Sequence, residues 1–289
     1  MRAYLPDYDL RVPATLGEAL TLLAQEPGVW KPFAGGTDLM VLLEAGKLEQ
    51  TKFISLWGLT ELRGITTSDD EIIVGALTTY TELQNNPVLQ SEFPLLCQAA
   101  GLTGSVAIQN RGTLGGNIAN ASPAADSLPA LLVYEASLEL ISTSGTRIVP
   151  YPGFHTGYKK SVMKADEIIR AIRLPRTTAG WFQASRKVGT RRAQAISKVC
   201  LAAMAQVENS FIRDIRLACG SVAPVPLRCV RTEAALKSQP IDETVISAAR
   251  TELANELRPI DDLRSTAEYR LRVAGNLLEE FLWKAAGER

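Results

Sequence analysis

Two glycine-rich stretches contain the residues best suited to bind a ligand. The first reads Phe33-Ala34-Gly35-Gly36-Thr37-Asp38 and the second reads Arg111-Gly112-Thr113-Leu114-Gly115-Gly116-Asn117. Glycine lacks a Cβ atom, so its main chain reaches positive φ values and can approach a ligand closely. Successive exposed N–H groups then form a concave, partly positive surface that suits phosphate oxygens. Two such turns in one chain favour a ligand with a diphosphate and a long body, such as a dinucleotide.

The spacing within these stretches excludes two familiar nucleotide sites and leaves another explanation open. The first stretch lacks the lysine-serine ending of a P-loop, which disfavours hydrolysis of nucleoside triphosphates. It also lacks the G-x-G-x-x-G spacing of a Rossmann fold. Because glycine marks many loops that bind nothing, spacing alone supports two tight turns without a ligand as well as a nucleotide site.

Side chains near both turns indicate what else could contact a ligand. Asp38 would repel a phosphate, so we expect it to cap a helix or to bind a ligand hydroxyl. Arg111 supplies a positive charge beside the second turn. Asn117 and Asn120 either contact a flat polar ring or satisfy the main chain of the turn, as asparagine often does. The basic segment 187–192 is either a solvated rim or a source of positive charge near a cofactor or partner.

Groups for covalent or metal chemistry are scarce. His155 is the only histidine, and we expect it to be a hydrogen-bonded residue of a surface turn at 153–157. Zinc enzymes commonly use two or three histidines. The cysteines form no C-x-x-C pair, and we interpret them as reduced, buried thiols that pack as small apolar side chains: Cys97, Cys200, Cys219 and Cys229. Demanding chemistry is therefore expected from a cofactor rather than from side chains.

The composition is typical of a globular protein of about two domains. The 289 residues are 46% hydrophobic and 21% charged, and 31 basic residues balance 31 acidic ones. This balance disfavours a nucleic-acid partner. No stretch approaches the roughly 18 consecutive apolar residues of a membrane span. The first residues carry acids and a proline where a secretory signal would have an apolar run, so we expect a cytoplasmic protein.

Apolar periodicity and turn residues predict two α/β units in the first part of the chain. The expected elements of the first unit, up to about residue 56, are a helix capped by Thr15 and Glu18, strands at 29–33 and 52–56, and a helix from 39 to about 46. Those of the second, about 57–176, are strands at 71–76 and 168–174, helices at 94–101 and from 122–126 onward, and a hairpin of 138–142 with 146–149.

A linker-like segment at 175–180 separates this part from a different pattern. We place a domain boundary near residue 176, which gives domains 1–176 and 177–289. The second domain is expected to contain strands at 196–207 and 212–219 and helices at 243–257 and 265–286.

Several motifs together resemble the FAD-binding subunit of the xanthine dehydrogenase family, the medium subunit of the molybdenum hydroxylases. They are residues 31–38, 110–117, 121–126 and 187–192. Residues 152–157 and 223–229 look most like bacterial xanthine dehydrogenase flavin subunits. One departure is the run Ala193-Gln194-Ala195-Ile196-Ser197, where relatives often carry an acidic residue followed by Ile-Ala. The clustered cysteines of relatives with an extra iron–sulfur cluster are also absent.

The resemblance implies an α+β fold of two domains. The first would be an FAD-binding domain of the PCMH, or vanillyl-alcohol-oxidase, type, made of two α/β subdomains. The second would resemble the C-terminal α+β domain of carbon monoxide dehydrogenase flavoproteins.

By the same resemblance, FAD would be bound noncovalently, with no catalytic side chain and no metal in this chain. Residues 31–38 and 112–116 would hold its diphosphate and ribityl regions, and Asp126, Ile169 and Lys187 would lie near the flavin ring. The implied cofactor-binding residues are Lys31, Pro32, Phe33, Ala34, Gly35, Gly36, Thr37, Asp38, Gly112, Thr113, Leu114, Gly115, Gly116, Asn117, Asp126, Ile169 and Lys187.

The resemblance also implies a role in electron transfer. A large partner subunit would carry the molybdenum cofactor and a small one two 2Fe-2S clusters, from which electrons reach the flavin and then NAD⁺ or another acceptor. Two alternatives remain open: a self-contained flavin oxidase or reductase of the same fold superfamily, and an assembly subunit that keeps only the fold.

Overall fold

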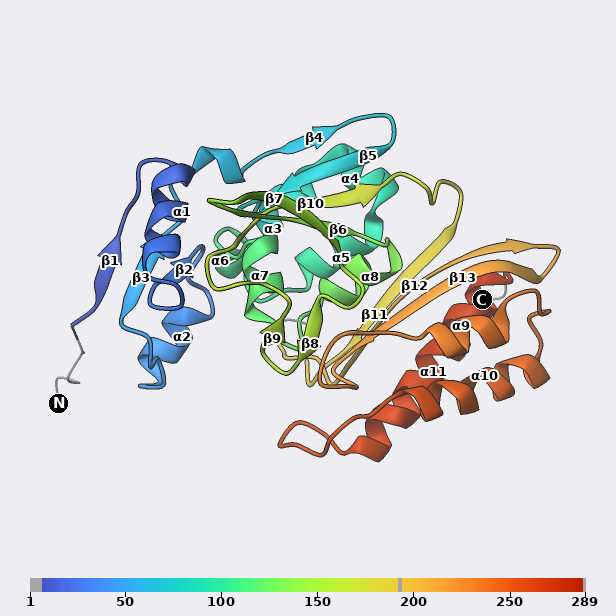
Figure 1. Cartoon of the computed structure of the whole chain (residues 1–289). Coiled ribbons are helices and arrows are strands. Elements are labelled where there is room, and N and C mark those ends of the chain that lie inside the picture. The colour runs from blue at the N-terminus through green and yellow to red at the C-terminus, as the bar shows by residue number, and fades with distance from the viewer. Residues whose placement is uncertain (1–6, 192–193, 288–289) are drawn as a thin grey trace.

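The computed structural model describes residues 7–191 and 194–287 and has three bodies side by side, from the blue N-terminal body to the red C-terminal helices (Figure 1). Each body is built on its own β-sheet. The sheet orders are β1-β3-β2, β4-β5-β10-β6-β7 and β11-β12-β13-β14, and β8 pairs with β9 in a small separate ribbon.

The first body is a parallel α/β unit, as expected. Its elements are β1 (Asp9–Arg11), α1 (Leu16–Gln25), β2 (Lys31–Phe33), α2 (Leu39–Glu44) and β3 (Lys52–Ser55). The Thr15 hydroxyl accepts a hydrogen bond from the Glu18 amide at 3.2 Å. The Glu18 carboxylate instead accepts from the Ala14 amide at 2.8 Å, so only one half of the predicted capping box forms. The Leu20 face of α1 packs on this sheet.

The second body places a run of helices on an antiparallel sheet. Its strands are β4 (Ile65–Thr67), β5 (Glu71–Gly75), β6 (Ser137–Ser142), β7 (Gly145–Pro150) and β10 (Ile168–Pro175), with β8 (His155–Gly157) and β9 (Lys160–Ser161) beside them. Its helices are α3 (Tyr80–Asn85), α4 (Pro87–Glu92), α5 (Pro94–Gly101), α6 (Val106–Gln109), α7 (Leu114–Asn120) and α8 (Leu128–Val133); a 3₁₀ turn at Thr60–Leu62 precedes them.

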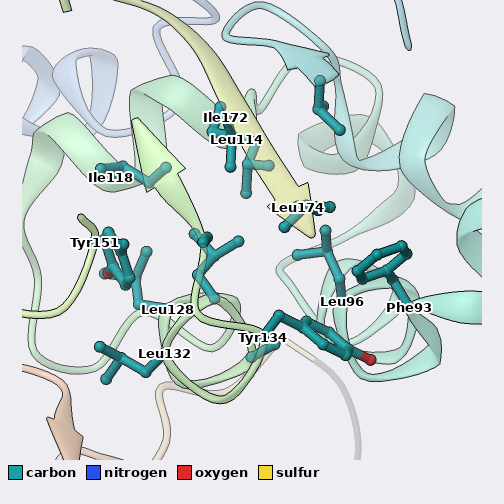
Figure 2. Close-up of a cluster of buried hydrophobic side chains, with 14 of the residues drawn as sticks. Phe93, Leu96, Leu114, Ile118, Leu128, Leu132, Tyr134, Tyr151, Ile172 and Leu174 are labelled. Atoms are coloured by element: carbon teal, nitrogen blue, oxygen red, sulfur yellow. The ribbon is translucent and has the colours of Figure 1, made fainter. Parts of the chain in front are cut away.

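The core of this body joins the helices to the sheet, as Figure 2 shows. Phe93 and Tyr134 pack edge to face with ring centroids 4.9 Å apart. The Tyr134 hydroxyl is satisfied, since it accepts from the Leu95 amide at 3.0 Å and donates to Gln183 at 2.6 Å. Leu114 and Ile118 of α7 are fully buried in the same cluster, so the helix that follows the second glycine turn is firmly held.

The third body is an antiparallel sheet with helices on one face. Its elements are β11 (Phe182–Val188), β12 (Val199–Glu208), β13 (Phe211–Gly220), β14 (Leu227–Arg228), α9 (Val230–Leu236), α10 (Glu243–Glu256) and α11 (Ala267–Ala285). On β12, Ala202 and Met204 belong to the core of the second body, while Leu201 and Ala203 pack with the C-terminal helices. This strand is buried on both faces, which explains its unbroken apolar run.

Most predicted elements are confirmed, and one helix start is wrong. We expected a helix from Ser122, but α8 begins at Leu128. Ala121 adopts a left-handed conformation, with φ 50°, that ends α7, and the Ser221 amide binds the Pro123 carbonyl at 2.8 Å. Residues 121–127 therefore form turns tied to the third body. Among the described residues, no helix is both long and apolar enough to cross a membrane.

Candidate cofactor site

The two glycine turns meet at a main-chain contact. A Cβ atom at Gly35 would overlap the carbonyl oxygen of Arg111 and would lie 2.7 Å from its carbonyl carbon. A Cβ at Gly116 would lie 3.8 Å from the Cβ of Ala34. The absence of side chains therefore lets the first turn rest directly on the second, although 75 residues of sequence separate Gly35 from Arg111.

The main-chain donors of the first turn have no acceptors within the described part of the chain. Gly36 has a φ of 78°, which favours glycine, and its Cα faces the ring of Phe33. The amides of residues 35–38 donate no hydrogen bond to any residue that the structure describes, and the Met40 amide, which binds the Gly36 carbonyl at 2.9 Å, starts the bonding of α2. Four successive unengaged N–H groups are the arrangement that binds phosphate oxygens.

The second turn uses its glycines differently from the first, and contact of residues 112–116 with FAD stays a prediction. Four of its amides already donate to protein acceptors: Gly112 to Ile108 O (2.6 Å), Leu114 to Thr78 O (3.0 Å), Gly115 to Ala76 O (2.9 Å) and Gly116 to Thr113 Oγ1 (3.2 Å). A Cβ at Gly115 would lie 2.8 Å from the Ala76 carbonyl oxygen. Close packing of α7, rather than amide donation to a phosphate, is what requires glycine here.

Arg111 also connects the turns through its side chain. Its guanidinium carbon lies 3.7 Å from the ring centroid of Trp57, and that of Arg63 lies 4.4 Å from the same centroid. Arg63 further donates to the Trp57 carbonyl at 2.9 Å. Trp57, just after β3, thus lies in cation–π contact with both arginines and joins the first two bodies. The sequence marked Arg111 as a counter-charge but gave no signal for Trp57.

Asp126 and Lys187, both predicted near the flavin ring, form a largely buried ion pair. The Lys187 Nζ lies 2.6 Å from the Asp126 carboxylate, and the two side chains are 10% and 11% exposed. Lys187 also donates to the Leu102 carbonyl at 2.9 Å, and Ser197 donates to the other oxygen of Asp126. Burial raises the pKa of Asp126, while Lys187 and Ser197 oppose that rise. The positive charge expected at Lys187 is therefore compensated by Asp126.

The turn after α7 connects this pair with the glycine turns. The Asn117 side chain accepts a hydrogen bond from Ser127 at 2.6 Å, so this amide helps to satisfy a turn.

Asp38 stands at the start of α2 but makes no capping hydrogen bond with its side chain, so its predicted capping role is wrong. Contact with a ligand hydroxyl remains the prediction for Asp38. Ile169 lies on β10 and is only 4% exposed, which leaves little of it for a ligand.

A second group of polar residues surrounds the C-terminal end of α7. His155 Nε2 lies 2.9 Å from the Ile118 carbonyl, so the histidine is hydrogen-bonded as expected, although it lies on β8. Burial lowers its pKa, and the bond to Ile118 acts in the opposite direction. Lys159 donates to the carbonyl and the side chain of Asn120 at 2.7 and 2.6 Å. Burial lowers the pKa of Lys159, and the negative charge of Asp38 acts in the opposite direction.

Other expected features have simple outcomes. All four cysteines are free, with Cys97 half-buried and the others buried. In residues 7–191 and 194–287, no group of three or more histidine, cysteine or acidic side chains is arranged to hold a metal ion. Arg192 and Ala193 lie outside the described residues. A hollow of about 810 Å³ between α10 and α11 is lined by none of the predicted site residues.

Comparison with known protein families gives two matches that together cover most of the chain. Residues 6–177 match the family model of the FAD binding domain in molybdopterin dehydrogenase, and residues 184–285 match that of the CO dehydrogenase flavoprotein C-terminal domain. The chain belongs to the FAD-binding medium subunits of the xanthine dehydrogenase and molybdenum hydroxylase family. The predicted family and the predicted fold class are thus confirmed.

Individual members of this family are similar over nearly their whole length. The xanthine dehydrogenase FAD-binding subunit of Escherichia coli is 34% identical, over 94% of each chain. The carbon monoxide dehydrogenase medium chain of Hydrogenophaga pseudoflava is 29% identical, over 96% of each chain. A solved structure of carbon monoxide dehydrogenase from the same organism superposes with a TM-score of 0.93, covering 98% of this chain and 99% of that one.

The residues at the first glycine turn fit the diphosphate of FAD. Four amides without protein acceptors supply donors, and the Gly35–Arg111 contact leaves no room for a side chain on that surface. The two turns thus differ: the first has main-chain donors without protein acceptors, and most amides of the second are already hydrogen-bonded.

Proposed function

We propose that this subunit binds FAD noncovalently with the diphosphate on residues 35–38, and that it relays electrons from the 2Fe-2S clusters of a small partner subunit to NAD⁺. The unengaged amides beside the Gly35–Arg111 contact are the observation that carries this proposal. When bound, FAD supplies the electron-transfer chemistry, for which this chain provides binding and electrostatics.

The remaining predicted residues are assigned by their place along the chain and by the family resemblance. Lys31, Pro32 and Phe33 lead into it on β2, and Thr37 and Asp38 lead out of it. Thr113, Gly116 and Asn117 lie on the supporting turn and at the start of α7. Asp126, Ile169 and Lys187 are assigned to the flavin ring. The division of the chain near residue 176 falls between β10 and β11, and it belongs to the same proposal.

Noncovalent binding is supported by the surroundings of His155. Its Nε2 lies 2.9 Å from the Ile118 carbonyl, and its Nδ1 lies 3.5 Å from the Tyr151 hydroxyl. Both ring nitrogens thus have protein neighbours, which disfavours a covalent link to a flavin. This arrangement also argues against a self-contained oxidase with a histidine-tethered cofactor.

Partner subunits are supported by the surface of α2. The helix reads Leu39-Met40-Val41-Leu42-Leu43-Glu44, and none of its residues is buried. Met40 and Val41 are 51% and 61% exposed. Apolar surface of this kind is typical of a protein–protein contact. We assign the molybdenum-cofactor large subunit and the 2Fe-2S small subunit as partners, and we place the assembly in the cytoplasm.

Native purification tests this function. The assembly should contain the two partners and should reduce NAD⁺ with a substrate of the molybdenum subunit, whereas this chain alone should oxidise neither purines nor aldehydes. Flavin absorption should be present, and acid precipitation should release the flavin into the supernatant. A colourless chain that takes up no FAD would overturn FAD binding; a flavin-loaded assembly that reduces other acceptors but not NAD⁺ would overturn only the acceptor assignment.

A further inference from the structure

Ser197 is a buried serine whose hydroxyl donates a hydrogen bond to the Asp126–Lys187 pair. It is 1% exposed, and its Oγ donates to Asp126 Oδ1. Lys187 Nζ binds the other oxygen, Oδ2, at 2.6 Å. A buried carboxylate needs partners on both oxygens, and here one partner is charged and the other neutral. The hydroxyl thus helps to fix the orientation of the carboxylate beside the ammonium group.

These three residues come from separate parts of the fold. Asp126 lies in the turn between α7 and α8, Lys187 on β11, and Ser197 just before β12. The second and third bodies therefore meet at this cluster. Lys187 is fixed to the second body by a further bond, since it donates to the Leu102 carbonyl at 2.9 Å.

Few other ionisable groups influence Asp126. The Cys200 thiol on β12 and the Tyr80 phenol on α3 interact with its charge, and burial raises the pKa of both. Both groups are therefore neutral near pH 7, which leaves Lys187 as the cation and Ser197 as the neutral donor at the carboxylate. Losing the serine bond removes one of the contacts that oppose protonation of Asp126.

We propose that Ser197 is a positioning residue of the flavin site: its hydroxyl holds Asp126 so that the carboxylate fixes Lys187 and compensates its charge. The proposal rests on the assignment of Asp126 and Lys187 to the flavin ring made above. Without the hydroxyl, Asp126 is held less firmly against Lys187, so the charge of Lys187 is less compensated. A more positive surrounding favours the reduced cofactor, which has gained negative charge.

The test is a redox titration of FAD bound to the full-length chain. In Ser197→Ala, the affinity for reduced FAD relative to oxidised FAD should rise about tenfold, which raises the two-electron potential by about 30 mV. Ser197→Thr keeps the hydroxyl and should restore the wild-type potential. Ser197→Cys keeps the side-chain volume but donates only weakly, so it should shift the potential in the direction of the alanine variant and serves if that variant does not fold.

Ser185→Ala is the matched control. The Ser185 hydroxyl donates to Gln98 at 2.8 Å, so it also joins β11 to the second body, but outside the cluster. The potential of FAD bound to Ser185→Ala should equal the potential of FAD bound to the wild type. Wild-type chain without bound FAD would overturn the proposed function and this inference together. Bound FAD with unchanged potentials in the Ser197→Ala and Ser197→Cys variants, or an equal shift in Ser185→Ala, would overturn this inference alone.

Discussion

Gly35 and Arg111 touch through their main chains: the Cα of Gly35 faces the Arg111 carbonyl, with no space for a Cβ atom between them. Through this contact the first glycine turn, whose amides are free, rests on the second, whose amides are engaged within the protein. The second turn is itself fixed, because α7 packs on Ala76 through Gly115. Under the proposed function, the first turn binds the diphosphate and the second turn supports it.

Replacement of Gly35 by alanine should weaken FAD binding. The new methyl group must separate the turns, and overpacking of this kind costs roughly 1–3 kcal/mol, or about 5- to 160-fold in the dissociation constant. Fluorescence titration of the deflavinated full-length chain measures this. Gly58→Ala is the control, because a Cβ there meets no atom within 4 Å. Equal affinity of the Gly35→Ala and Gly58→Ala variants would contradict the account.

His155 should make stability depend on pH. Burial lowers its pKa in the folded chain below the ordinary value of 6.5, so the unfolded chain binds more protons. Stability is therefore lost as pH falls through about 6.5, by at most about 1.4 kcal/mol per pH unit. Urea unfolding at pH 7.5 and 5.5 should show a larger loss for the wild type than for His155→Gln. The same loss in both proteins would rule out this role of His155.

Arg270 should be important for stability rather than for cofactor binding. On α11 it is 3% exposed and donates to the Lys198 and Ser221 carbonyls at 3.1 and 2.7 Å and to Asp262 at 2.7 Å. Arg270→Met leaves these buried acceptors without their donor, which should lower the free energy of unfolding by about 3–5 kcal/mol.

Arg272, exposed on the same helix, provides the comparison for Arg270. Arg272→Met should change the free energy of unfolding by less than about 0.5 kcal/mol, because it removes only a cation–π contact with Tyr269 at 6.0 Å. Denaturant unfolding of both variants measures the difference. A loss of less than about 1 kcal/mol in Arg270→Met would show that the buried carbonyls find other donors.

Local patterns were sufficient to predict most elements of the fold. The hairpin around Ser144 and Gly145 and the helix from Pro94 to Gly101 have strong local signals, and both form. The predicted helix start at Ser122 was wrong, although serine, proline and an acid are favourable at a helix start. Its side chains are instead used in tertiary contacts, since the Asp126 carboxylate binds Lys187 and Ser197. The spacing of residues in the sequence does not predict such long-range contacts.

The motifs of the candidate site could be predicted from the sequence, but the difference in hydrogen bonding between its two turns could not. Two similar glycine pairs predicted the same role for both turns. The two turns differ in their hydrogen bonds because Thr78 and Ala76, remote in sequence, supply acceptors for amides of the second turn. Trp57 and Ser197 were missed for the same reason: each acts through residues far along the chain, Trp57 through Arg111 and Ser197 through Asp126.

The most direct test of the central claim compares FAD with riboflavin, which lacks the diphosphate and adenosine, in binding to the deflavinated full-length chain. If amides of residues 35–38 hold the diphosphate, two charge-assisted hydrogen bonds at roughly 1.5–3 kcal/mol each should make FAD bind at least about a hundredfold more tightly. Gly35→Ala should reduce this preference. Riboflavin binding as tight as that of FAD, or a wild-type preference retained in full by Gly35→Ala, would contradict the proposed site.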